Sequence, residues 1–178
     1  MVVNLIFNKK SLFPDNWIYI QTPGVSVGRV QNYKNWSPAM VADQEKTTLG
    51  AEYFVTEGDR FWNLPDEEMI QHALKELEYL KIADSADYVD GFVVRVANVY
   101  PVYGPGYQSS IAVIRKYLNG IQNLTLMGRS GMFRYDNSDH ALLSGLLAAR
   151  NYMGSDHDLW RINTEKVYHE EYQSTEIY

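Results

Sequence analysis

Residues 128–137 gather arginine, tyrosine and glycine side chains in one short stretch of the sequence. Arg129, Arg134 and Tyr135 supply hydrogen-bond donors, and a helix is expected to begin directly after them at Ser138. The first N–H groups of a helix have no partner inside the helix and carry a partial positive charge. Donors of these kinds in one place are suited to bind an anionic or electron-rich ligand. The stretch therefore predicts a ligand site.

The elements that must position these donors follow one another in the sequence without a gap. Residues 124–127 are typical of a short buried strand, residues 128–137 of a turn-rich loop, and residues 138–152 of a helix. Because the loop is short, we expect Arg129 and the helix start to face one cavity. We also expect Phe133 and Tyr135 to be only partly buried.

The expected helix has one face with almost no side-chain bulk, formed by Ala141, Ser144, Gly145, Ala148 and Ala149. Glycine inside a helix costs about 1 kcal/mol relative to alanine, so a close neighbour is its usual reason. That neighbour is either a sheet packed tightly on the helix or a bound cofactor. The sequence leaves both interpretations open.

Residues 128–140, with the sequence GRSGMFRYDNSDH, resemble the C-terminal flavin-binding motif of UDP-galactopyranose mutases and their amine-oxidase-like and protoporphyrinogen-oxidase-like relatives. The resemblance is specific over residues 123–151 and looser over residues 17–62, 99–103 and 106–107. It implies a strand-loop-helix that closes over the ribityl and ring end of FAD. The cofactor-binding residues that it implies are Gly128, Arg129, Asn137, Ser138 and Asp139.

The substrate domain that the resemblance implies contains further candidate residues. Arg29 and Asn32 lie on one expected strand, whose polar residues form either a solvated face or a wall of the flavin cavity. Arg95 interrupts a valine-rich strand and needs a partner, because an unpaired buried charge is expensive; it contacts either the substrate or a structural ion-pair partner. Tyr103 and Tyr135 complete the predicted substrate-binding residues. No carboxylate or histidine stands out as an acid or base, so the catalytic residues stay unknown.

The order of the expected elements predicts an α+β fold with a mostly antiparallel sheet, because strands joined by short turns come early and helices are interspersed later. Strands are expected at residues 2–7, 17–20, 25–35, 47–57 and 88–100, and helices from Pro65 and over residues 109–119 and 138–152. We divide the chain into a substrate-domain-like sheet with helices (1–122), the strand-loop-helix that closes over FAD (123–154) and a polar C-terminal tail (155–178).

The composition excludes several kinds of partner and site. A net charge of −6 argues against nucleic acid and anionic membranes, since a phosphate-binding face needs a basic stripe. The absence of cysteine excludes disulfides and thiolate metal sites and favours a cytoplasmic location. The four histidines show no metal-ligand spacing, so no metal site is predicted. No apolar run reaches the length of about 18 residues expected of a membrane span.

The glycine-rich motif that holds the ADP half of FAD in such flavoproteins is not found in this sequence. Its nearest match is Gly104-Pro105-Gly106, where Ser109 stands in place of the third glycine and the proline stiffens the turn. We interpret this match as a structural turn. The chain is therefore expected to be the C-terminal portion of a flavoenzyme, with the N-terminal Rossmann unit absent.

Three functions are consistent with these features. The first is the C-terminal part of a flavin-dependent oxidoreductase, contributing the substrate cavity and the flavin-ring side of the FAD site. The second is part of a UDP-galactopyranose mutase-like isomerase acting on a nucleotide sugar, and the third is a non-catalytic binding or interaction module. The expected partners are a small-molecule substrate and the missing N-terminal dinucleotide-binding half. Alone, the chain is expected to be inactive, to bind FAD weakly or not at all, and to expose an apolar surface that favours self-association.

Overall fold

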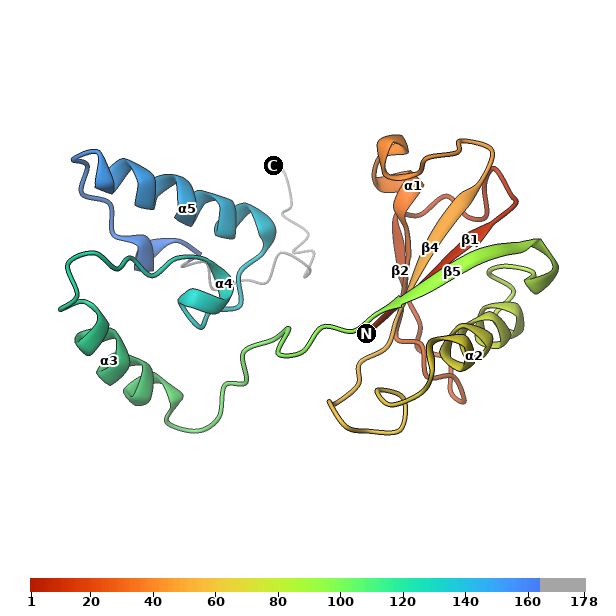
Figure 1. Ribbon diagram of the computed structural model, residues 1–178, viewed down its shortest axis with the longest axis horizontal. Helices are drawn as coiled ribbons and strands as arrows, with labels where there is room; N and C mark the ends of the chain where they lie inside the picture. Colours follow the sequence, from red (N-terminus) through yellow and green to blue (C-terminus); the bar gives the residue numbers. More distant parts are fainter. Residues whose placement is uncertain (164–178) are drawn as a thin grey trace, which may run out of the picture. The chain divides into compact units, whose positions relative to one another are not determined.

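The computed structural model describes residues 1–163 of the chain (Figure 1). The chain divides into two compact units, the first spanning Met1–Ala97 and the second beginning at Asn98. This division falls earlier than the predicted boundary after residue 122, so helix α3 (Tyr107–Leu118) belongs to the second unit. Of the predicted polar tail, residues 164–178 lie outside the described residues.

Unit 1 is a five-stranded sheet with the strand order β2-β3-β4-β1-β5. Every neighbouring pair is antiparallel, which confirms the predicted α+β fold with an antiparallel sheet. The strands are β1 (Val2–Phe7), β2 (Trp17–Tyr19), β3 (Arg29–Asn32), β4 (Thr47–Glu52) and β5 (Tyr88–Val94). The helical elements are α1 (Tyr33–Trp36), α2 (Asp66–Tyr79) and the 3-10 turns η1 (Pro38–Met40) and η2 (Ser85–Asp87).

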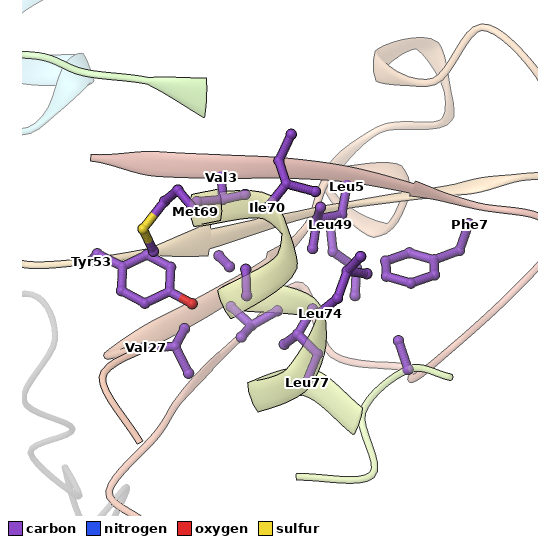
Figure 2. Packing of buried hydrophobic residues seen from close by; sticks show 14 residues of the cluster. Val3, Leu5, Phe7, Val27, Leu49, Tyr53, Met69, Ile70, Leu74 and Leu77 are labelled. Carbon is purple, nitrogen blue, oxygen red and sulfur yellow. The ribbon is translucent and has the colours of Figure 1, made fainter. Parts of the chain in front are cut away.

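Helix α2 covers one face of this sheet and builds the core of unit 1 with it. Its first turn carries three acidic residues directly after Pro65, which suits the positive end of a helix. Its apolar stripe then buries Met69, Ile70, Ala73, Leu74 and Leu77. Figure 2 shows these side chains packed with the inward residues of the strands, among them Val3, Leu5, Phe7 and Leu49. Strand alternation turns the remaining residues of each strand to the opposite face.

Strands β2 to β5 are shorter than the sequence predicts, and the pairing explains the differences at β3, β4 and β5. Val2, the first residue of β1, pairs with Glu52 on one side and with Val94 on the other. Strands β4 and β5 therefore end at the residues that pair with Val2, and beyond β4 Met1 and Tyr53 still exchange hydrogen bonds. Strand β3 begins only at Arg29, because the preceding N–H groups of Ser26 and Val27 bond to a side chain of α2 instead of to a strand.

That side chain is the buried carboxylate of Glu76. Its oxygens accept from the N–H of Ser26 at 2.5 Å, from the N–H of Val27 at 3.0 Å and from the phenol of Tyr53 at 2.9 Å. His72 Nε2 lies 3.2 Å from it but without hydrogen-bond geometry. Burial, and then the neighbouring carboxylate, raises the pKa of Tyr53. The phenol therefore stays protonated and donating.

Unit 2 is helical in its described part. It consists of α3, α4 (Gly128–Gly131), α5 (Ser138–Tyr152) and the 3-10 turn η3 (Leu159–Arg161). A small apolar cluster holds it together, formed by Met132, Ala148, Leu159 and Ile162. Helix α5 has the predicted bounds, and α3 begins two residues earlier than expected. Within the described residues, no helix combines the length and the apolar character that crossing a membrane requires.

The buried strand predicted at residues 124–127 is wrong for this structure. The residues pair with no strand in the described chain, and only Leu126 is half-buried while its three neighbours are exposed. A strand needs a hydrogen-bonded neighbour, and unit 2 contains no other strand among the described residues to provide one. The predicted loop after it also differs, since it opens with the single turn of α4.

Candidate functional site

The start of α4 and the residue before it are fixed to the small-residue face of α5. Gly128, which has a positive φ of 71°, donates its N–H to the Ser144 hydroxyl at 2.8 Å, and that hydroxyl donates to the carbonyl of Ala141. A Cβ on Gly145 would lie 4.0 Å from the sulfur of Met127. The small residues thus allow the chain's own preceding segment to lie close to the helix. Tight packing accounts for Ser144, although the neighbour is a loop and not a sheet.

Arg129 forms the centre of a cluster of aromatic rings. Its Cζ lies 4.8 Å from the ring centroid of Tyr100 and 4.4 Å from that of Tyr135, and the two rings stack at 5.5 Å. Its Nη1 donates to the carbonyl of Asp136 at 3.2 Å. Nε and Nη2 are buried and have no hydrogen-bond partner among the described residues. These two donor nitrogens of the guanidinium therefore remain available to an acceptor that is not among the described residues.

The first turn of α5 presents free backbone donors beside this arginine. The side chain of Asn137 caps the N–H of His140, and the His140 ring accepts from the N–H of Asn137 at 3.4 Å, which completes a capping box. The exposed N–H groups of Ser138 and Asp139 have no partner within residues 1–163. With the helix dipole, these two groups attract an electron-rich ligand.

Tyr103 connects the segment before α3 to the loop. Its hydroxyl accepts from the N–H of Tyr135 at 2.6 Å, and its ring stacks on Tyr107 at 4.5 Å and meets Phe133 edge to face at 5.9 Å. Phe133 and Tyr135 are partly exposed, as the sequence predicts. The structure therefore brings together three of the predicted site residues, Arg129, Tyr103 and Tyr135.

A cavity of about 870 Å³ opens between α3, the loop and η3. None of the residues that line it is acidic. Its aromatic rings and its arginine and lysine side chains come from Tyr103, Tyr107, Arg115, Lys116, Phe133, Arg134, Tyr135 and Trp160. Asn137 lines it, but Arg129, Ser138 and Asp139 do not. Arg129 thus does not line this cavity, and its guanidinium lies close to the rings of Tyr100 and Tyr135. The expectation that Arg129 shares a cavity with the helix start stays a prediction.

The cations around this cavity are not equally available. Arg134 donates to the carbonyls of Trp160 at 2.8 Å and Asn163 at 2.6 Å, so it fixes the chain after α5. Arg115 lies over the Trp160 ring, with its Cζ 4.2 Å from the centroid. Lys116 is exposed. The predicted role of Arg134 as a ligand donor gives way to a structural one.

In unit 1, Arg29 belongs to a polar row on the sheet face opposite α2. Its guanidinium pairs with Glu52 at 2.5 and 2.9 Å, and Glu52 also accepts from Gln31. Both charged side chains are largely covered, at 14% and 10% exposed. The exposed rings of Tyr19 and Phe54 border the row.

Asn32 does not share that row, which corrects the prediction that it faces one cavity with Arg29. Side chains alternate along β3, so Asn32 points to the core side with Val30. It is 1% exposed, and its amide donates to the carbonyl of Phe13 at 3.3 Å. Its role in unit 1 is structural.

Arg95 is held by unit 1 itself. It donates to the carbonyls of Trp62 at 2.9 Å and Leu64 at 2.6 Å, and it pairs with Asp66 at 2.5 Å. These contacts tie the end of β5 to the start of α2. These contacts agree with the structural ion pair that was one of the two interpretations of Arg95. No substrate contact is needed to explain the position of this side chain.

Sequence reasoning missed three residues of these clusters. Glu52, the partner of Arg29, was detectable as a lone acid on the face of β4 opposite its apolar residues. Tyr100 stacks with Arg129, and only the richness in tyrosine around residue 100 hinted at it. Asp136 is buried and accepts from Asn163 at 2.8 Å, a contact across 27 residues that no local pattern predicts.

Comparison with known proteins gives matches to solved structures. No family model and no curated protein matches the sequence. A crystal structure of reduced UDP-galactopyranose mutase matches with a TM-score of 0.75 and 17% identity, over 92% of this chain and 35% of that chain. A protein from Exiguobacterium sp. 255-15, assigned as a protoporphyrinogen oxidase, matches with a TM-score of 0.57 and 20% identity, over 72% of this chain and 29% of that chain.

At these identities the matches establish the fold. Both solved structures carry names from the group that residues 128–140 resemble, so the resemblance is confirmed at the level of the fold. The chain spans about a third of the length of the proteins that it matches.

Proposed function

We propose that this chain is the C-terminal part of a flavin-dependent oxidoreductase and supplies the flavin-ring side of the FAD site. One observation carries the proposal: Arg129, whose Nε and Nη2 have no partner among the described residues, donates to the carbonyl of Asp136, two residues before a 15-residue helix whose first N–H groups are free. The fold shared with a mutase and an oxidase supports it. The proposal includes a cytoplasmic location, the usual one for a chain without cysteine.

The donors in this segment fit FAD. Nε and Nη2 of Arg129 need acceptors, and so do the N–H groups of Ser138 and Asp139. The phosphate, ribityl and ring oxygens of FAD are acceptors. When bound, FAD supplies the redox chemistry, while the protein supplies binding, orientation and electrostatics. Gly128, Arg129, Asn137, Ser138 and Asp139 are the residues that we propose to hold it.

The side chains around Arg129 have positioning roles in this proposal. The guanidinium fixes the ring of Tyr135 and the carbonyl of Asp136. The hydroxyl of Tyr103 accepts from the N–H of Tyr135, so its own proton is free to be donated to a second acceptor. We propose that Tyr103 and Tyr135 contact the small-molecule substrate. In unit 1, Glu52 holds Arg29 in place within the polar row.

A mutase-like isomerase acting on a nucleotide sugar is the second candidate function. The observation that favours it is the cavity lined by aromatic and basic side chains and by no acidic one. A nucleotide sugar combines a flat base, which stacks on aromatic rings, with a diphosphate, which binds cations. Lys116 and the rings of Tyr107 and Trp160 are the lining residues that we propose for such a ligand.

Titration of the ¹⁵N-labelled chain with FAD, followed by NMR, tests the proposed site. We expect weak binding, with amide shifts concentrated at Gly128 and at Ser138 and Asp139. Titration with UDP should move different amides, those around Tyr107 and Trp160, if the mutase-like alternative is correct. Shifts from neither ligand, with or without an added dinucleotide-binding half, would favour the non-catalytic interaction module and overturn the proposal.

A further inference from the structure

A short segment after helix α5, residues 158–163, is held against the loop that precedes this helix. We call this segment the clasp. Its apolar residues Leu159 and Ile162 are buried in the small apolar cluster of unit 2, at 7% and 8% exposed. Burial of two apolar side chains anchors the clasp to the body of the unit. The clasp therefore has a fixed position from which its polar groups can hold the loop.

Hydrogen bonds join the clasp to the loop in both directions. Arg134 of the loop donates to the carbonyls of Trp160 and Asn163 in the clasp. In return, Nδ2 of Asn163 donates to the carbonyl of Tyr135 at 3.0 Å and to Oδ1 of Asp136 at 2.8 Å. The Asp136 side chain is buried, so its oxygens need donors from the protein. One asparagine side chain thus holds two successive residues of the loop.

Both of these loop residues contact Arg129. The ring centroid of Tyr135 lies 4.4 Å from the Cζ of Arg129, and the carbonyl of Asp136 accepts from its Nη1 at 3.2 Å. A long side chain keeps one orientation only where its neighbours hold it, because ordering it costs rotamer entropy. The direction in which the two unpartnered donors Nε and Nη2 point therefore depends on where Tyr135 and Asp136 are held.

We infer that Asn163 and Asp136 are positioning residues for the FAD site. Their hydrogen bond fixes the loop, and the loop fixes the Arg129 guanidinium in the orientation that binding requires. The inference rests on the proposed function, in which Arg129 holds FAD. Asn163 has a positive φ of 52°, a conformation that asparagine adopts more readily than most residues. This residue type therefore supplies both the backbone conformation and the donor.

The alternative is that the clasp only closes unit 2, and Asn151 provides the comparison. Its side chain donates to the carbonyl of His157 at 2.7 Å and accepts from the N–H of His157 at 2.7 Å. These two bonds fix the turn after α5 and do not involve residues 134–136. If closure of unit 2 is the whole role of the clasp, loss of either asparagine side chain should have the same effect on Arg129.

NMR of the ¹⁵N-labelled full chain without ligand tests the positioning itself. Ring currents of Tyr100 and Tyr135 should shift the Nε–H signal of Arg129 away from the signals of the exposed arginines. Asn163→Gly, which suits the positive φ, should move the signal toward those of the exposed arginines, and so should Asp136→Ala. Asn151→Ala is the matched control and should leave it in place.

Asp136→Asn separates the hydrogen bond from the charge. The amide oxygen of the variant still accepts from Asn163, so the Arg129 signal should stay in place. A signal that moves as far in Asp136→Asn as in Asp136→Ala would overturn the inference. An Arg129 signal that does not move in Asn163→Gly, or that moves equally in Asn151→Ala, would overturn it as well.

FAD affinity then separates the inference from the proposed function. With the dinucleotide-binding half added, Asn163→Gly should weaken FAD binding about tenfold and Asn151→Ala should leave it unchanged. Weaker binding in Arg129→Ala but not in Asn163→Gly would overturn the inference and spare the proposed function. Unchanged binding in Arg129→Ala as well would overturn the proposed site, and the inference with it.

Discussion

Arg129 is the residue on which the proposed FAD site depends most. Arg129→Ala should lower the FAD affinity of the reconstituted protein about tenfold to a hundredfold, because a hydrogen bond to a charged group contributes about 1.5–3 kcal/mol. Arg129→Lys keeps the charge but loses the planar contact with Tyr100 and Tyr135, so it should recover only part of the affinity. Equal affinity in all three proteins, measured by flavin fluorescence, would remove Arg129 from the site.

The ion pair of Arg29 and Glu52 should matter for stability, since both side chains are largely covered. Glu52→Gln leaves the guanidinium without its charged partner and should lower the free energy of unfolding by about 3 kcal/mol. The matched control is Glu45→Gln, which breaks the exposed pair with Lys10 and should change stability by less than about 1 kcal/mol. Urea unfolding measures the free energy of unfolding of both variants. Similar losses in the two variants would contradict a stabilising role for the Arg29–Glu52 pair.

At the residue scale, the sequence indicated which side chains are polar and near a site but not which way they point. Arg29 and Asn32 were expected to face one cavity, yet three residues of separation on a strand put them on opposite faces. Arg95 was detectable as a charge that needs a partner. Its acceptors, the carbonyls of Trp62 and Leu64, come from a loop more than thirty residues away, which local pattern does not reveal.

At the scale of elements, the contact between Tyr53 and Glu76 should make unit 1 sensitive to alkaline pH. Burial raises the pKa of Tyr53 above the usual value of about 10. The stabilisation is therefore complete below about pH 10 and is lost as pH rises further, because the unfolded tyrosine ionises while the folded one stays protonated. Tyr33 and Tyr88, whose pKa values burial also raises, add to the same trend.

Tyr53→Phe is the variant that isolates this contribution. It should lower the free energy of unfolding at pH 7 by about 1.5–3 kcal/mol, because the Glu76 carboxylate loses a donor. It should also flatten the fall in stability above pH 10. Urea unfolding at pH 7 and pH 10.5 gives both quantities, and an unchanged pH dependence would count against the buried contact.

Gly145 distinguishes packing from ligand binding on the small face of α5. A Cβ there would meet only the sulfur of Met127 at 4.0 Å, so Gly145→Ala should stabilise the chain by about 0.5–1 kcal/mol. In contrast, a Cβ on Gly91 would lie 2.7 Å from the carbonyl oxygen of Asn4, and Gly91→Ala should destabilise it. If Gly145 is there for a cofactor, the stabilised variant should bind FAD less well when reconstituted. Unchanged FAD binding would favour packing alone.

Elements with their own strong pattern were predicted well. β1 and α5 have the bounds expected from alternation and from helical periodicity. The lengths of the paired strands were predicted less well, since β4 and β5 end at the residues that pair with Val2. Residues 124–127 show the opposite case, in which the pattern of a strand is present while the described chain contains no partner for it. A local pattern states what a segment is able to form, and its neighbours decide whether it does.

At the scale of the whole molecule, the chain spans about a third of the solved structures that share its fold. Under the proposed function, FAD is therefore divided between two polypeptide segments. The donors near Arg129 and the start of α5 would bind one end of FAD, and a second domain would bind the adenosine and pyrophosphate. Losing three or four hydrogen bonds to phosphate, each contributing about 1.5–3 kcal/mol, weakens binding by several powers of ten.

The absorbance of the purified chain near about 450 nm, where oxidised flavins absorb, tests this division most directly. The chain alone should be colourless after purification and should retain no FAD on gel filtration. Adding the upstream dinucleotide-binding polypeptide should restore a yellow complex with one FAD per chain. Stoichiometric FAD retained by this chain alone would contradict the central claim, and so would a complex that binds no flavin.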